Sequence, residues 1–212
     1  DIFIESRLQN TRTQNVIGYL PGKSDSLIVF TAHYDHVGMM GNKTFFPGAH
    51  DNASGTAMVL DLARFYASKK EKPEYSMLFI FFAGEELGLL GSLYYVQNPV
   101  YPLENIKFLV NLDMISGGEK GIKVVNGSVF QSEFDTLSKL NKENNLLADV
   151  SIRGAAANSD HYYFYEKGVK CFFIYSLGAY SEYHTVNDKA VGLPLYEYED
   201  IFNLLTLFVQ TI

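Results

Sequence analysis

Apolar and polar residues alternate along the chain with two different periods, which predict strands that alternate with helices. Runs of β-branched, aromatic and other apolar residues predict buried strands at Asn15–Tyr19, Ser26–Ala32, Ser76–Ala83, Lys107–Ile115, Gly121–Val125 and Val169–Ser176. Polar residues spaced by three and four predict amphipathic helices at Ala53–Ser68, Glu86–Gln97, Gln131–Asn145, Asp160–Lys167 and Leu195–Thr211. This order predicts an α/β fold in one domain, residues 1–212, with a central, mostly parallel mixed β-sheet sandwiched by helices.

Composition and charge exclude several classes of protein. The 212 residues are 47% hydrophobic and 19% charged, which is typical of a folded domain with a sizeable core. No apolar run approaches the roughly 18 residues that a membrane span needs. The 17 Lys and Arg residues against 24 Asp and Glu residues give a net charge of −7, and the basic residues form no cluster. We therefore expect no nucleic-acid partner and no membrane span, whereas the acidic excess suits bound cations.

Side chains that bind metal ions lie at the ends of the predicted strands. Four strands end with, or are followed by, candidates of this kind, which are His33, Asp35, Glu85, Glu86, Asp113 and His184. Asp51 adds another, directly before the helix predicted at Ala53–Ser68. Parallel sheets bind ligands at the carboxyl ends of their strands, so we expect these side chains to converge. Two imidazoles and several carboxylates at such an edge are typical of a dinuclear metal hydrolase.

Taken alone, most of these residues also have a purely structural interpretation. His33 and Asp35 could form a surface pair, and Asp51 or Asn52 could cap the helix that follows. Two consecutive glutamates at a helix start could simply complement the helix dipole. Asp113 fits such an interpretation least, because an unpaired carboxylate within an apolar strand costs several kcal/mol. It therefore favours a bound cation.

Several ordered segments carry a resemblance to a known family. They are His33-Tyr34-Asp35, Gly48-Ala49-His50-Asp51-Asn52-Ala53-Ser54-Gly55, Ala83-Gly84-Glu85-Glu86-Leu87-Gly88, Asn111-Leu112-Asp113-Met114 and Tyr183-His184-Thr185. In this order they resemble the co-catalytic dinuclear zinc aminopeptidases of metallopeptidase family 28, such as the bacterial leucyl aminopeptidases. The resemblance covers nearly the whole chain and implies the fold of the zinc exopeptidases, which is phosphorylase/hydrolase-like.

The resemblance implies two Zn²⁺ ions per chain, with Asp51 bridging them. Each ion would have two further ligands: Glu86 and His184 on one, His33 and Asp113 on the other. Asp35 would orient His33 through its second ring nitrogen, as partners of metal-bound histidines commonly do. His36 and His50 are interpreted as polar residues near the site and not as ligands.

The same resemblance implies a metal-dependent aminopeptidase that hydrolyses the first peptide bond of peptides with a free N-terminus. Hydroxide held by the two zinc ions would attack this bond, and Glu85 would act as general base. Tyr183 would donate a hydrogen bond to the oxygen that becomes negative, while packing beside the site is an equal alternative. For Ser159 we expect a cap of the helix Asp160–Lys167; the less favoured alternative is that Asp160 or His161 supports the metal ligands.

Apolar side chains near the predicted site could form a pocket for the first side chain of the peptide. The candidates are Met39, Met40, Phe45, Phe46, Phe172, Phe173 and Tyr180. Such residues belong more often to the core of a protein than to a pocket. If they line the site, the first substrates to test are those that begin with Leu, Phe or Met.

Two other functions stay open at this point. Glutaminyl cyclase, a single-zinc acyltransferase, shares the fold and several ligand segments, but it has Trp before the final His. This chain has Tyr183 there and no Trp at all, which favours hydrolysis. A metal-free, receptor-type binding domain would have no physical reason to keep the buried carboxylates. The family and a first residue that is Asp rather than Met favour an extracytoplasmic protein, secreted or periplasmic, of unknown oligomeric state.

Overall fold

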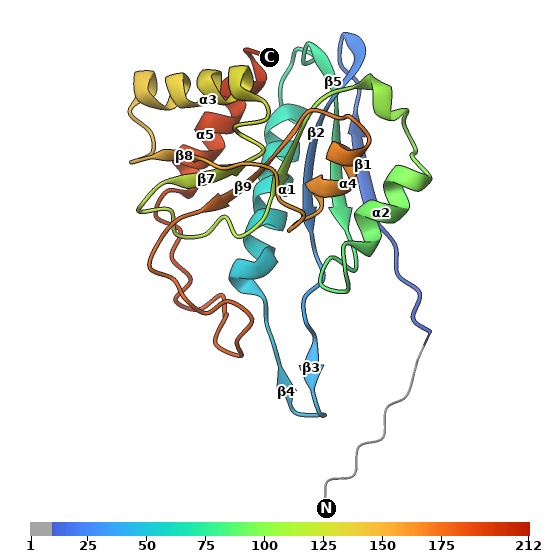
Figure 1. Cartoon of the computed structure of the whole chain (residues 1–212), viewed down its shortest axis with the longest axis vertical. Coiled ribbons are helices and arrows are strands. Elements are labelled where there is room, and N and C mark those ends of the chain that lie inside the picture. The colour runs from blue at the N-terminus through green and yellow to red at the C-terminus, as the bar shows by residue number, and fades with distance from the viewer. Residues whose placement is uncertain (1–9) are drawn as a thin grey trace, which may run out of the picture.

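A seven-stranded mixed β-sheet forms the centre of the computed structural model, which describes residues 10–212 (Figure 1). The strand order is β1-β5-β2-β6-β9-β7-β8. The strands are β1 (Val16–Leu20), β2 (Ser24–His33), β5 (Tyr75–Phe82), β6 (Ile106–Leu112), β7 (Ile122–Val125), β8 (Val150–Ile152) and β9 (Cys171–Ser176). Parallel pairs join β2 to β5 and β6, β6 to β9, and β7 to β8, whereas β1 and β7 run antiparallel to β5 and β9. The predicted mixed, mostly parallel sheet is confirmed.

Helices cover both faces of this sheet, as the sequence predicts. They are α1 (Gly55–Ala67), α2 (Leu90–Gln97), α3 (Gln131–Asn144), α4 (His161–Glu166) and α5 (Tyr198–Val209). The helices α1, α3 and α5 cover one face of the sheet, and α2 and α4 cover the other (Figure 1). Within residues 10–212, no helix combines the length and the apolar character that a membrane crossing requires.

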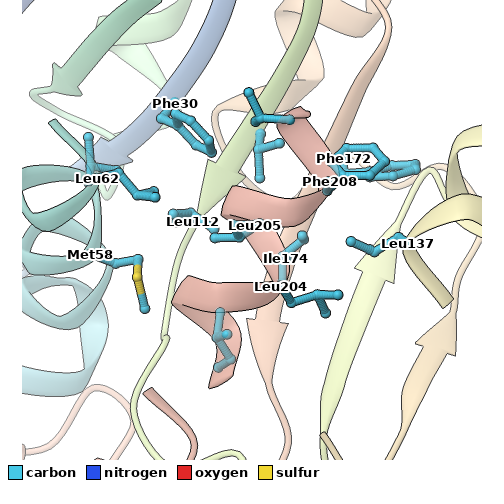
Figure 2. Close-up of a cluster of buried hydrophobic side chains, with 14 of the residues drawn as sticks. Phe30, Met58, Leu62, Leu112, Leu137, Phe172, Ile174, Leu204, Leu205 and Phe208 are labelled. Atoms are coloured by element: carbon cyan, nitrogen blue, oxygen red, sulfur yellow. The ribbon is translucent and has the colours of Figure 1, made fainter. Parts of the chain in front are cut away.

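Each face of the sheet has its own core, and β2 contributes to both. Ile28 and Phe30 join the core under α1 and α5, while Leu27 and Val29 join the core under α2 and α4. Successive residues of a strand point to opposite faces, so a strand buried on both sides must be apolar at nearly every position. Figure 2 shows the first core, in which Leu205 of α5 lies among side chains of the sheet.

Three short strands lie outside the sequence prediction: β3 (Met39–Met40), β4 (Thr44–Phe45) and β8. Segments of two or three residues leave no readable period, which is why the pattern does not reveal them. β3 and β4 pair with each other as a hairpin that projects beyond the carboxyl ends of the central strands (Figure 1).

The helix predicted from Glu86 begins only at Leu90, so this boundary was wrong. Gly84, Gly88 and Leu89 have φ angles of 75°, 102° and 59°, which place their backbone in the left-handed region. The chain therefore turns between β5 and α2. Both glutamates of this segment lie in the turn, at the edge of the sheet where the strands end.

The predicted strand Lys107–Ile115 also ends earlier than expected, because β6 stops at Leu112. Asp113 is therefore the first residue beyond the strand and not a residue within it. Its backbone N–H donates to the carbonyl of Ile174 at 3.2 Å, which keeps Asp113 beside the neighbouring strand β9. Residues 1–9 of the predicted domain lie outside the described part of the chain.

Candidate metal centre

Imidazoles and carboxylates converge at the carboxyl ends of the central strands. His33 is the last residue of β2, Asp113 follows β6, and Glu86 lies in the turn after β5. Asp51 comes from the turn η1 (Ala49–Ser54) that leads into α1, and His184 comes from the segment after β9. The structure thus brings together all five residues that the sequence predicts as ligands.

Asp51 lies between two histidines. Its Oδ1 is 3.2 Å from Nε2 of His33, and its Oδ2 is 2.9 Å from Nε2 of His184. Each histidine has a second carboxylate beside it, because Oδ1 of Asp113 is 3.4 Å from His33 Nε2 and Oε1 of Glu86 is 3.1 Å from His184 Nε2. The two oxygens of Asp51 therefore face two separate ligand groups, as a bridging carboxylate must.

The two groups contain more residues than the sequence predicts. Ligand atoms that lie within 4.8 Å of one another define one group of His33, Glu85 and Asp113 and a second of His36, Asp51, Glu86 and His184. His36 is the unexpected member, with Nδ1 2.9 Å from Oε1 of Glu86. Its position three residues after His33, where β2 ends, is the sequence signal that could have suggested it. His50 joins neither group, and its Nδ1 lies 2.5 Å from Oγ of Ser116.

Several atoms of the site are buried and have no hydrogen-bond partner among the described residues. They are Nε2 of His33, both ring nitrogens of His36, Nε2 of His184, Oε1 of Glu86 and Oδ1 of Asp113. A buried polar atom without a partner costs about 1–3 kcal/mol, so six of them at one place favour a bound partner. Nitrogen and oxygen donors of this kind suit Zn²⁺ and related divalent ions. The residues therefore fit a pair of bound cations.

The electrostatics of the site also favour bound cations. Burial disfavours a charged His33, but the adjacent carboxylates of Asp113 and Asp51 outweigh burial and raise its pKa to about 12. Burial is the largest influence on Glu85 and raises its pKa to about 8; His33 opposes this change, and the carboxylates of Asp113, Asp160 and Glu86 add to it. A buried carboxylic acid that retains its proton in this way is one that a nearby cation would stabilise in its ionised form.

Asp35 supports the site in a different way from the one expected. Its carboxylate accepts hydrogen bonds from the backbone N–H groups of Glu85 (3.1 Å) and Glu86 (3.2 Å). Nδ1 of His33 lies 3.2 Å from the backbone carbonyl oxygen of Asp35 but 3.7 Å from its carboxylate. The contact with His33 is therefore made by the main chain, because the carboxylate already holds the turn that carries both glutamates.

The contacts of Asn52 show that this residue, and not Asp51, caps the start of α1. Its Oδ1 accepts from the N–H of Gly55 at 2.9 Å and from the N–H of Met114 at 3.1 Å, and its Nδ2 donates to the carbonyl of Leu112 at 3.0 Å. Asn52 thus caps the helix and links the turn of Asp51 to the end of β6. The carboxylate of Asp51 is left to face the two histidines.

Ser159 was expected to cap a helix, and this prediction was wrong. Its hydroxyl donates to Oδ2 of Asp113 at 2.9 Å and accepts from Nδ2 of Asn111 at 2.8 Å, whose Oδ1 accepts in turn from Thr31 at 2.6 Å. All of these side chains are buried. These hydrogen bonds hold Oδ2 of Asp113, so that Oδ1 of the same carboxylate points to His33.

Tyr183 lies at the rim of the site. Its ring stacks on His184 with centroids 3.8 Å apart, and 55% of its surface is exposed. Partial burial and then the carboxylates of the site raise the pKa of its hydroxyl to about 12, so it stays a hydrogen-bond donor at neutral pH. Packing beside the site and donation from the hydroxyl are both compatible with this position.

A cavity of about 330 Å³ opens on the candidate ligands. Its walls are formed by Asp51, Glu85, Glu86, Asp113, Met114, Arg153, Asn158, Phe173, Tyr175 and Tyr183. Of the apolar residues expected to form a substrate pocket, Phe173 lines this cavity. Met39, Met40 and Phe45 lie exposed on the β3–β4 hairpin. Phe172 belongs to the core.

The family model of peptidase family M28 matches residues 15–209. The chain belongs to peptidase family M28. It is 35% identical to aminopeptidase YwaD of Bacillus subtilis over 166 residues, which cover 76% of this chain and 35% of that protein. It is 31% identical to leucine aminopeptidase 1 of Trichophyton rubrum over 145 residues, which cover 64% of this chain and 39% of that protein. This M28 chain therefore spans well under half of the length of both relatives.

Solved structures agree with the family assignment. BSAP, a zinc aminopeptidase from Bacillus subtilis, superposes with a TM-score of 0.77 and 27% identity, covering 93% of this M28 chain and 49% of that chain. A glutaminyl cyclase from an Acidobacteriales bacterium has the same TM-score of 0.77 at 23% identity, covering 93% of this chain and 72% of that chain. The cyclase likeness shows the shared fold alone.

Proposed function

We propose that this M28 chain is the catalytic part of a zinc-dependent aminopeptidase, which hydrolyses the first peptide bond of peptides that have a free N-terminus. The observation that carries the proposal is the position of Asp51, whose two oxygens face two histidines that each have their own second carboxylate. Similarity to an aminopeptidase and to a zinc aminopeptidase of Bacillus subtilis supports it.

The proposal assigns two zinc ions to the two ligand groups. His33 and Asp113 would hold one ion, Glu86 and His184 the other, and Asp51 would contact both. When bound, two such ions polarise the carbonyl of the scissile bond and lower the pKa of a water that they share. The buried positions of Asp51 and Asp113, which are 3% and 5% exposed, keep bulk water away from these carboxylates.

Glu85 is proposed as the group that moves the proton. It lies next to Glu86 in the same turn, and its carboxylate belongs to the group of His33 and Asp113. The pKa of about 8 reflects burial among other carboxylates, and two dications beside Glu85 would favour the ionised form. Its carboxylate can then accept a proton from the attacking water and deliver it to the departing amine.

Tyr183 is proposed to stabilise the charge that develops on the carbonyl oxygen. Its raised pKa keeps the hydroxyl protonated, which is the state that a donor to an oxyanion needs. Stacking on His184 restricts the ring to the rim of the cavity. Removing such a donor commonly costs about 10²–10³-fold in kcat, so Tyr183→Phe separates donation from packing, which the phenyl ring would preserve.

The proposal is tested with purified protein, zinc analysis and a panel of aminoacyl p-nitroanilides, with and without chelator. We expect turnover that chelator abolishes and zinc restores. Glu85→Gln should retain its zinc and lose at least ~10²-fold in kcat, because it removes the proton acceptor and not a ligand. Glu104→Gln, at an exposed glutamate in the short helix η2 (Leu103–Asn105), is the matched control and should keep full activity.

The outcome also separates the alternative functions. Turnover that is indifferent to chelator would refute a metal-dependent mechanism. Cyclisation of N-terminal glutamine without cleavage of any peptide would instead identify a glutaminyl cyclase. Protein that binds no zinc and converts neither kind of substrate would favour a binding domain.

A further inference from the structure

One basic residue lines the cavity beside the candidate zinc ligands. Arg153 directly follows β8, and it is the single Lys or Arg among the residues that line this cavity. Its backbone is fixed by β7, because its N–H donates to the carbonyl of Val124 at 2.9 Å. The main chain therefore holds Arg153 at the cavity wall, where its side chain is exposed.

The guanidinium has a neutral partner and no acidic one within residues 10–212. Its Nη1 donates to the hydroxyl of Tyr175 at 3.2 Å, and none of the ion pairs among these residues includes Arg153. An arginine presents five N–H donors in a planar fork that matches a carboxylate. Among residues 10–212, most of these donors have no protein acceptor, so the side chain is available to a ligand that enters the cavity.

The rest of the cavity divides into two parts by chemistry. The carboxylates of Asp51, Glu86 and Asp113 belong to the proposed zinc ligands, whose negative charge the bound cations would balance. Glu85, the proposed proton acceptor, adds a fourth carboxylate on the same side. The remaining wall combines the apolar surfaces of Met114, Phe173 and Tyr183 with polar groups of Arg153, Asn158 and Tyr175. The apolar part of this wall can contact the methylene groups of a substrate, and Arg153 can bind an acidic group at the end of them.

We propose that Arg153 is a specificity-determining residue that binds a carboxylate of the peptide substrate. The inference rests on the aminopeptidase function proposed above and refines its substrate class. It departs from the expectation of Leu, Phe or Met at the first position, because six of the seven apolar residues behind that expectation lie outside this cavity. The carboxylate can come from the side chain of an N-terminal Glu or Asp, or from the C-terminus of a short peptide.

Two substrate pairs distinguish these sources in the zinc-loaded enzyme. Glutamyl and glutaminyl p-nitroanilide differ in the side-chain carboxylate and have no C-terminal carboxylate. Leucylglycine and leucylglycinamide differ in the C-terminal carboxylate alone. We expect the acidic member of one pair to be preferred in kcat/KM, and Arg153→Gln to reduce that preference at least ~10-fold, as loss of a charge-assisted hydrogen bond does.

Arg153→Lys separates the charge of Arg153 from the planar shape of its guanidinium as the cause of the preference, and Arg64→Gln is the control. Arg153→Lys keeps the charge without the planar fork and should retain part of the preference. Arg64→Gln removes a surface arginine whose side chain is 81% exposed and paired with Asp61 on α1, and it should leave both preferences unchanged. If Arg153→Gln leaves both ratios within twofold of the parent enzyme, the inference is wrong.

A binding measurement keeps the inference separable from the proposed function. Calorimetry on the zinc-loaded protein would compare glutamate and glutamine α-hydroxamates, and a phosphinic dipeptide analogue with its C-terminal amide. If no peptide is hydrolysed but Arg153→Gln still abolishes tighter binding of an acidic compound, the function fails and the inference stands. If peptides are hydrolysed and no acidic compound is favoured by the parent protein, the function stands and the inference fails.

Discussion

The hydroxyl of Ser159 donates to Oδ2 of Asp113 at 2.9 Å, on the side of the carboxylate away from His33. One oxygen of Asp113 is thereby satisfied by protein, and the other is left for the candidate metal centre. The two residues lie 46 positions apart in the chain, so this contact exists only in the folded protein. It makes Ser159 a positioning residue for a proposed ligand.

Ser159→Ala should weaken zinc binding without removing a ligand. Loss of a partner that orients a metal ligand commonly costs about 10- to 100-fold in metal affinity. Competition with a chelator of known affinity measures this effect directly. Ser132→Ala, at an exposed serine on α3, is the control and should bind zinc like the parent protein. Equal affinities for the two variants would show that the hydrogen bond does not position Asp113.

His36 should contribute to only one of the two proposed ions. Its Nδ1 lies 2.9 Å from Glu86, within the group that contains His184, and no ligand of the other group is involved. We therefore expect His36→Asn to bind one zinc ion as tightly as the parent and the second at least ~10-fold more weakly. Stepwise titration with zinc, followed by metal analysis, resolves the two events.

His50→Asn is the matched comparison for His36→Asn. His50 is buried near the site, but it contacts Ser116 and belongs to neither ligand group. Its variant should bind both ions normally. If both variants lose the same ion to the same extent, the effect of His36 is a general disturbance of this edge and not a contact with Glu86.

The convergence of the proposed ligands could be predicted because several of them lie at the ends of apolar strands. His33 ends one such strand and Glu86 lies in the turn after another, and the ends of parallel strands meet at one edge. Ser159 and Arg153 could not be assigned in this way. Their contacts with Asp113 and Tyr175 depend on where α4 and β8 pack against the sheet, which no period in the sequence encodes.

The start of helix α2 was predicted wrongly for a related reason. The pattern after β5 is compatible with a helix from Glu86, yet Gly84, Gly88 and Leu89 adopt left-handed backbone angles that delay the helix to Leu90. A glycine permits such a conformation without requiring it. The turn is fixed by tertiary contacts, among them the two hydrogen bonds from the backbone to Asp35.

Asp160 should make stability fall as pH rises in the metal-free protein. Its carboxylate is 0% exposed, and burial raises its pKa to about 7 against an opposing hydrogen bond from Ser92. The folded state therefore keeps a proton that the unfolded state has lost. The free energy of unfolding should decrease from about pH 4 to pH 7, by on the order of 4 kcal/mol if Asp160 acts alone.

Urea unfolding in chelator at several pH values measures this dependence. Asp160→Asn removes the titrating group, so its free energy of unfolding should decline less over the same range. Asp135→Asn, at an exposed position of α3, should retain the decline of the parent protein. If the free energy of unfolding falls equally with pH in Asp160→Asn and in the parent protein, Asp160 does not hold this proton.

Removing the metal should destabilise the protein as a whole. Zinc binds the folded site and not the dispersed ligands of the unfolded chain, so zinc at 100 times its Kd adds about 2.7 kcal/mol per ion. For a chain of this size, that is a rise of about 5–10 °C in Tm over the chelated protein. Asp51→Asn should lose most of the rise in Tm, because the proposed bridge serves both ions.

Magnesium should not replace zinc in this measurement, since two imidazole ligands suit Zn²⁺ better than Mg²⁺. A Tm that is the same in zinc and in chelator would contradict the metal centre and leave the buried carboxylates of Asp51 and Asp113 to be explained by a metal-free binding domain.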